Sequence, residues 1–197
     1  MIITVASFKG GVAKTTSAVH LAAYFQQKGE TVLIDGDPNR SATGWAKRGN
    51  LPFKVIDERQ AVKHAKNFEH IVIDTQARPD REDLEALADG CDLLVLPTTP
   101  DALALDALML TIDELKSIGA DRYKILLTII PPKPSKDGED ARGTLAEAGL
   151  PLFKTGIRRL SAFQKASLAG VPVYGVADNR AKQGWGDYQV VGKEILS

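Results

Sequence analysis

Short, uninterrupted runs of apolar and β-branched residues recur along the chain, and they constrain its fold more than any other feature. Strands buried on both faces of a sheet have this continuous apolar character, whereas half-exposed strands alternate between apolar and polar residues. The runs lie at residues 2–6, 31–35, 53–57, 70–75, 92–97, 124–130 and 152–157. They predict a mostly parallel sheet that is covered on both faces.

Segments whose apolar residues recur with helical spacing separate these runs. They lie at residues 15–29, 41–48, 80–89, 101–119 and 161–170. The alternation predicts an α/β fold with a doubly wound, mostly parallel sheet sandwiched by helices and joined by right-handed crossovers. The Pro- and Lys-rich stretch 131–140 is interpreted as a loop too short to separate domains, so we expect one domain over residues 1–197.

The composition excludes several classes of protein. The 197 residues include 25 basic and 25 acidic side chains, so a globally basic nucleic-acid coat is excluded and any DNA contact must be a local patch. The single cysteine, Cys91, cannot form an internal disulfide or a cysteine-ligated metal cluster. No apolar run approaches the roughly 20 residues that a membrane helix needs, and no export signal precedes the first run. We therefore expect a cytoplasmic protein.

The segment "ASFKGGVAKTTSA" (6–18) lies where a phosphate-binding loop is expected, between the first strand and the first helix. Gly10 and Gly11 allow the backbone to curl toward phosphate oxygens, Lys14 can reach the β- and γ-phosphates, and the Thr15 hydroxyl can bind Mg²⁺. The general pattern G-x-x-x-x-G-K-[ST] is broken at both of its glycines. Phe8 stands at the first glycine position and Ala13 at the second. The candidate nucleotide-binding residues of this loop are Gly10, Gly11, Val12, Ala13, Lys14, Thr15 and Thr16.

Carboxylates follow two of the predicted strands. In "LIDGDPNRS" (33–41), Asp35 and Asp37 follow the apolar residues of the second predicted strand, and in "IVIDTQA" (71–77) Asp74 ends the apolar run. Phosphoryl transfer requires Mg²⁺, positive charge and a positioned water, and carboxylates at strand ends beside the loop meet the first and last needs.

The stretch "KGGVAKTT" (9–16) resembles the deviant Walker A loop of the ParA/MinD family, a SIMIBI-like class of P-loop NTPases in which the position of Ala13 need not be glycine. The resemblance implies that Lys9 reaches across a homodimer to the partner's phosphates, that Asp37 orients the attacking water, and that Asp35 lies near the metal. It further implies that Asp74 holds Mg²⁺ through a water. Segments 92–105 and 156–175 resemble other parts of the family.

One departure concerns the base of the nucleotide. The polar residue that often contacts adenine in the family is replaced after the sixth predicted strand by Ile129, Ile130, Pro131 and Pro132. Base recognition is therefore expected to use backbone groups and packing against Pro131.

The resemblance to small ParA proteins implies ATP-driven dimerisation, non-specific DNA binding on the nucleoid, and hydrolysis stimulated by a ParB-like adaptor. The chain lacks the basic amphipathic C-terminal segment of MinD-like proteins, so no membrane docking is expected. Two alternatives stay open: a metabolic ligase of the dethiobiotin-synthetase kind, and a nucleotide switch that barely hydrolyses. The candidates for DNA contact are Arg158, Arg159, Lys165, Arg180 and Lys182.

Overall fold

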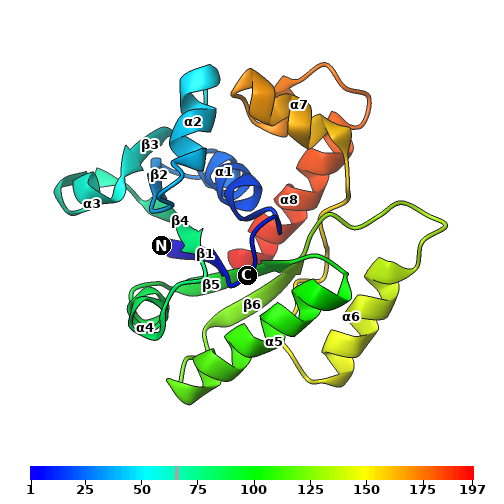
Figure 1. The fold of residues 1–197 in the computed structure, drawn as a ribbon. Coiled ribbons are helices and arrows are strands. Elements are labelled where there is room, and N and C mark those ends of the chain that lie inside the picture. The colour runs from blue at the N-terminus through cyan, green and yellow to red at the C-terminus, as the bar shows by residue number, and fades with distance from the viewer. Residues whose placement is uncertain (65–66) are drawn as a thin grey trace.

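The computed structural model describes residues 1–64 and 67–197, and within them six strands form one parallel sheet (Figure 1). The strand order is β3-β2-β4-β1-β5-β6. The strands are β1 (Ile2–Ser7), β2 (Thr31–Asp35), β3 (Lys54–Asp57), β4 (His70–Ala77), β5 (Leu93–Thr98) and β6 (Tyr123–Leu127). The prediction of a doubly wound parallel sheet is confirmed.

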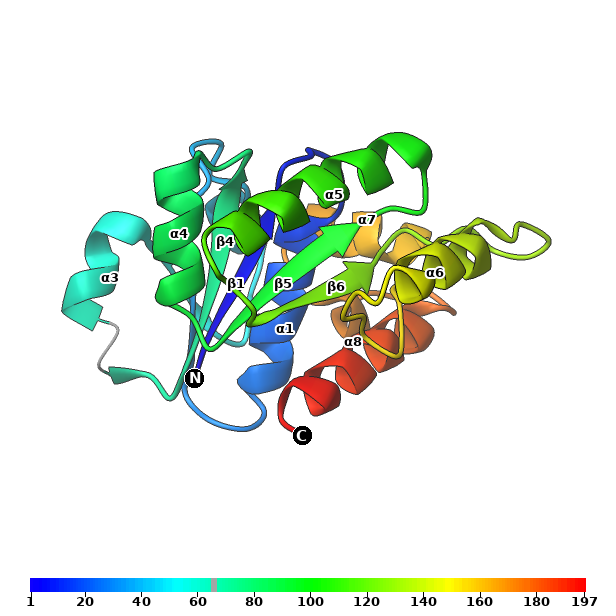
Figure 2. The same ribbon diagram turned by 90° about the horizontal axis from the view of Figure 1, so that it is seen from below.

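Helices cover both faces of this sheet. They are α1 (Lys14–Phe25), α2 (Ser41–Arg48), α3 (Glu58–His64), α4 (Arg81–Asp89), α5 (Ala102–Ser117), α6 (Asp137–Glu147), α7 (Ser161–Ala169) and α8 (Ala181–Ile195), with a 3₁₀ turn η2 (Val173–Gly175). Figure 2 shows α4 and α5 on one face of the sheet and α1 on the other.

The two larger apolar clusters fill the space between the sheet and its helices, and a smaller one lies on β2, β3 and β4. Successive side chains of a strand point to opposite faces. Val95 therefore belongs to the cluster under α1, α2, α7 and α8, whereas Leu94 and Leu96 belong to the cluster under α4, α5 and α6. All three side chains are buried, which explains the continuous apolar runs of the sequence.

Three predictions of secondary structure need correction. The segment 152–157 is not a strand, because the chain bends at Lys154 and Thr155. Leu152 makes an isolated bridge to Ile125 of β6, and Arg158, just after the segment, makes another to Ile130 beyond β6. The expected loop 131–140 becomes helix α6 from Asp137 onward. Helices α3 and α8 were not predicted.

The carboxyl ends of the strands meet at one edge of the sheet. Asp35 at the end of β2 is in register with Asp74 of β4, and Asp74 is in register with Val5 of β1. The loop between β1 and α1 leaves the sheet at this same edge, which brings the sequence motifs together. In residues 1–64 and 67–197, no helix combines the length and apolar character needed to cross a membrane.

Candidate nucleotide-binding site

The loop between β1 and α1 exposes its two glycines, Gly10 and Gly11. Ala13, the residue before α1, has φ 63° and forms no side-chain cap, and Gly11 has φ 81°. The first N–H groups of a helix have no intrahelical partner, and the helix dipole favours an anion beside them. Val12 is buried, and its carbonyl accepts a hydrogen bond of 3.0 Å from the Thr128 hydroxyl beyond β6, which anchors the loop.

Lys14 is the buried cation of this loop. Its side chain is only 8% exposed although it carries a charge, and it lies near enough to Asp74 to affect that carboxyl's pKa. A buried ammonium requires negatively charged partners to offset the loss of hydration. Phosphate oxygens at the N-terminus of α1 would supply them.

Asp74 lies fully buried at the end of an apolar strand segment. Neither of its carboxylate oxygens has a hydrogen-bond partner in the part of the chain that the structure describes. Burial raises its pKa to about 7, and the negative charges of Asp35 and Asp37 add to this rise. The nearby Thr15 hydroxyl and Lys14 ammonium oppose the rise in pKa, although the hydroxyl does not meet the geometry of a hydrogen bond to the carboxylate. A buried carboxylate with two unused oxygens beside a threonine hydroxyl is an oxygen donor set that suits hydrated Mg²⁺.

Asp35 differs from Asp74, because its oxygens are already used. Oδ2 accepts hydrogen bonds from the Thr43 backbone N–H (2.8 Å) and hydroxyl (2.6 Å), and Oδ1 accepts one from the Asp37 N–H (3.3 Å). Asp35 therefore ties α2 to the loop after β2. It is in register with Asp74, but its observed contacts are with the protein itself, and its place near a metal stays a prediction.

Asp37 lies in the loop after β2 and is mostly buried. Its Oδ1 accepts hydrogen bonds from the Asn39 N–H (2.8 Å) and side-chain amide (3.0 Å). The next residue, Arg40, has φ 54° and donates from its guanidinium to the Asp35 carbonyl at 2.9 Å. This turn fixes Asp37 on the same edge of the sheet as Asp74.

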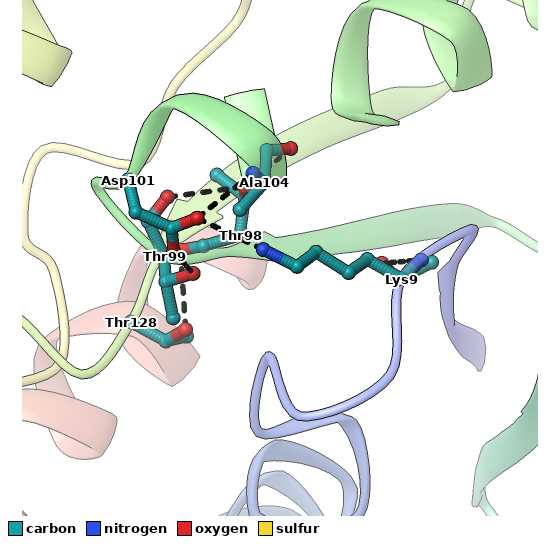
Figure 3. Close-up of polar contacts among 7 residues, drawn as sticks. Lys9, Thr98, Thr99, Asp101, Ala104 and Thr128 are labelled. Carbon is teal, nitrogen blue, oxygen red and sulfur yellow. Dashed lines mark hydrogen bonds and ion pairs between the residues drawn. The ribbon is translucent and has the colours of Figure 1, made fainter. Parts of the chain in front are cut away.

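Lys9 extends from the outer part of the loop rather than into the buried cluster. Its backbone N–H donates to the Ser7 hydroxyl at 3.1 Å, and its ammonium lies 2.8 Å from Oδ1 of Asp101 at the start of α5 (Figure 3). Its side chain is 30% exposed. The two loop lysines therefore occupy different environments.

A cleft of about 580 Å³ opens beside the phosphate loop. Ala13 and Thr16 form one wall, and residues from beyond β6 and from α7 and α8 form the others. The further lining residues are Ile129, Ile157, Arg158, Arg159, Leu160, Phe163, Gln164, Ser167, Leu168 and Tyr188. Its size and its mixture of apolar and polar side chains suit an aromatic base with polar edges. Ile129 lines the cleft, whereas Pro131 lies two residues farther along the chain.

The five predicted DNA contacts do not share one environment. Arg158 is bound to Asp187 of α8, with Nη2 2.6 Å from Oδ1, and this contact raises the arginine pKa. Lys165 pairs with Asp178 at 2.7 Å. Arg159, Arg180 and Lys182 are exposed.

Sequence reasoning missed two contacts of the site. The Thr128 hydroxyl reaches Val12 from 116 residues away, and Asp101 reaches Lys9 from 92 residues away. From the sequence, Asp101 is predicted only as a helix N-cap. An aspartate before a helical pattern indicates where the helix starts, and it gives no sign of a lysine partner.

These features together define a P-loop nucleotide-binding α/β protein, because the uncapped helix N-terminus, buried lysine and unpaired carboxylate meet at the carboxyl edge of a parallel sheet. The family model described as "CobQ/CobB/MinD/ParA nucleotide binding domain" matches residues 3–173. The chain belongs to this family.

Its similarities extend over nearly the whole chain. It is 33% identical over 201 residues to the maintenance of carboxysome distribution protein A of Gloeobacter kilaueensis, covering 98% of this chain and 93% of that protein. Apo McdA from Cyanothece superposes with a TM-score of 0.78 at 17% identity, covering 100% of this chain and 99% of the other. The ATP complex of a Cyanothece McdA variant superposes with a TM-score of 0.74 at 16% identity, covering 98% of this chain and 94% of the other. The structural matches show the shared fold.

Proposed function

We propose that this chain is a ParA-type ATPase. It forms a homodimer when it binds ATP and Mg²⁺, binds DNA without sequence preference, and hydrolyses ATP when a ParB-like adaptor stimulates it. The observation that carries the proposal is the loop after β1, where buried Lys14, outward Lys9 and the unpaired carboxylate of Asp74 surround an uncapped helix N-terminus.

The loop residues divide the work of binding the triphosphate. The backbone N–H groups around Gly10 and Gly11 and the Lys14 ammonium bind phosphate oxygens. Mg²⁺, when bound, neutralises charge on the phosphates. The Thr15 hydroxyl and, through a water, Asp74 hold this ion, and Asp35 lies at the same edge of the sheet.

Asp37 and Lys9 act on the transfer itself. Asp37, fixed by its turn with Asn39, orients the attacking water. Lys9 delivers positive charge to the phosphates of the partner subunit, as an arginine finger does in related hydrolases. Its outward position and partial exposure support a role between subunits.

The cleft beside the loop receives the nucleoside. Its apolar side chains, such as Ile129 and Phe163, offer packing surfaces for a base, and Ala13 and Thr16 join it to the phosphate loop. We expect backbone groups near Pro131 to contribute to base recognition, because Ile129 and Ile130 offer no polar side-chain atoms.

The cargo and the cellular location are inferred from the similar proteins. The family includes proteins named for carboxysome distribution, so a protein body of this kind is the favoured cargo, with plasmids or chromosomes as the other candidates. We expect the dimer to work on the nucleoid in the cytoplasm. Arg159, Arg180 and Lys182 are exposed on the surface and support a local DNA contact in a chain of zero net charge.

The proposal is tested by measuring mass by sedimentation and DNA binding by gel shift, each with and without Mg-ATP. The wild-type chain should dimerise and bind duplex DNA only with ATP. Lys9→Ala should stay monomeric, while Asp37→Ala should dimerise but lose turnover, so that its dimers persist. A metabolic ligase would ignore DNA and tolerate Lys9→Ala. A wild-type chain that stays monomeric at saturating Mg-ATP contradicts the proposal.

A further inference from the structure

The tip of the Lys9 side chain is held by its own subunit. Its ammonium lies 2.8 Å from Oδ1 of Asp101, the residue that caps α5, and Figure 3 shows the lysine extended between the phosphate loop and this helix. The side chain proposed to reach the partner's phosphates is therefore paired with a carboxylate of the same subunit.

The Asp101 carboxylate is fixed in place by other contacts. The backbone N–H of Ala104 donates to Oδ1 at 3.0 Å, and the Thr99 hydroxyl donates to Oδ2. The hydrogen bonds from Lys9 and Thr99 hold the pKa of Asp101 below its ordinary value, so the carboxylate stays charged at neutral pH. The Asp101 carboxylate that binds the Lys9 ammonium is therefore fixed in position and negatively charged.

Asp101 and a partner's triphosphate compete for the same ammonium. Lysine has three N–H donors but only one positive charge. If the carboxylate stayed 2.8 Å from the ammonium in a dimer, it would bring a negative charge toward the negatively charged phosphates. Assembly therefore requires the Lys9–Asp101 pair to weaken or separate.

We infer that Asp101 is a positioning residue that restrains Lys9 in the nucleotide-free subunit and so raises the concentration of chain and nucleotide needed for dimerisation. The inference rests on the proposed dimer function, which it deepens. An exposed ion pair contributes about a two- to fivefold effect on an equilibrium. A dimer separates two such pairs, so the combined effect is about four- to 25-fold.

The test uses Asp101→Asn, which removes the charge and keeps the helix cap, because asparagine caps helices as well as aspartate does. The matched control is Asp106→Asn, which removes an exposed carboxylate from the same helix. The dimer dissociation constant is measured by sedimentation in saturating Mg-AMPPNP. Asp101→Asn should lower it about four- to 25-fold, whereas Asp106→Asn should leave it within about twofold of wild type.

A purely structural role for Asp101 predicts a different pattern. Asp101→Ala would then lower thermal stability through loss of the cap, and Asp101→Asn would match wild type in every assay. A dimer that is unchanged or weaker in Asp101→Asn than in Asp106→Asn overturns the inference, while Lys9-dependent dimerisation of the wild type would leave the proposed function intact. A wild-type chain that stays monomeric in Mg-AMPPNP overturns both.

Discussion

The buried carboxylate of Asp74 lowers the stability of the nucleotide-free fold, and binding of Mg²⁺ beside it would offset this loss. Its pKa rises from 3.8 to about 7, first because of burial, so between these values the folded chain binds more protons than the unfolded chain. The free energy of unfolding therefore falls as pH rises through this window. At about 1.4 kcal/mol for each pKa unit, Asp74 destabilises the nucleotide-free chain at pH 8 by up to roughly 4 kcal/mol.

Asp74→Asn should remove this cost. We expect the variant to be more stable than wild type by a few kcal/mol at about pH 8 and nearly equal at about pH 4, because the amide resembles the protonated acid. Urea unfolding at both pH values measures the difference, and Mg-ATP should stabilise the wild type more than the variant. A variant less stable than wild type at the higher pH would contradict the assignment of Asp74 as a buried group with unused oxygens.

The residues of the site differed in how far the sequence predicted them. Lys14 and Thr15 follow from a short motif, because a strand-to-helix turn fixes local geometry within a few residues. The sequence placed Asp35 and Asp74 at the ends of strands, and the pairing of β2 with β4, which the sequence did not predict, brings the two residues into register. The Lys9–Asp101 and Thr128–Val12 contacts join distant segments, and the local sequence pattern contains no signal for them.

Among the secondary structure elements, α8 was missed because of its glycines. Gly184 and Gly186 interrupt the helical pattern and lower the helix propensity. In the structure, a Cβ at residue 184 would lie 2.9 Å from Phe163 of α7, and one at residue 192 would lie 2.2 Å from Cδ1 of Tyr24. Gly184 and Gly192 thus permit α8 to pack closely against its neighbours. Helix propensity does not reveal this tertiary contribution to stability.

The two other errors have related causes. Segment 152–157 has apolar residues because Phe153 and Ile157 are buried in the core, and their N–H groups bond to Ile125 and Leu127 of β6. The bend between these two residues prevents a continuous ladder of hydrogen bonds with β6. The apolar pattern of the segment therefore reflects burial and not strand structure. In 131–140, the prolines favour a loop, whereas the acidic first turn of α6, which begins at Asp137, favours a helix start.

Gly192→Ala tests the packing of α8 against α1. The added methyl group meets the Tyr24 ring, so we expect the variant to lose about 1–3 kcal/mol of stability despite its better helix propensity. Gly186→Ala is the matched control: nothing lies within 4 Å of its Cβ position, and alanine there should stabilise the same helix by about 0.5–1 kcal/mol. Chemical denaturation measures both, and equal effects would refute the packing explanation.

At the scale of the whole molecule, the nucleotide site and the proposed DNA contacts lie on one chain with no net charge. A monomer with a few basic residues would bind DNA weakly, because each phosphate contact adds little affinity at physiological salt. A dimer presents two such groups together, and the second contact becomes intramolecular. ATP-driven dimerisation would thereby couple nucleotide binding to DNA binding without any change within the DNA-contacting surface.

Replacing Arg180 and Lys182 by alanine tests this coupling. Both side chains are exposed at the start of α8, so the double variant should keep its fold and its Mg-ATP-dependent dimerisation. Its affinity for duplex DNA should fall, and a plot of log affinity against log salt should lose about 0.9 in slope for each phosphate contact removed. Lys116→Ala with Arg122→Ala, which removes two exposed charges near the opposite edge of the sheet, should leave the slope unchanged. If both double variants bind DNA equally well, the DNA-contacting surface lies elsewhere, and the C-terminal assignment fails even where ATP still controls binding.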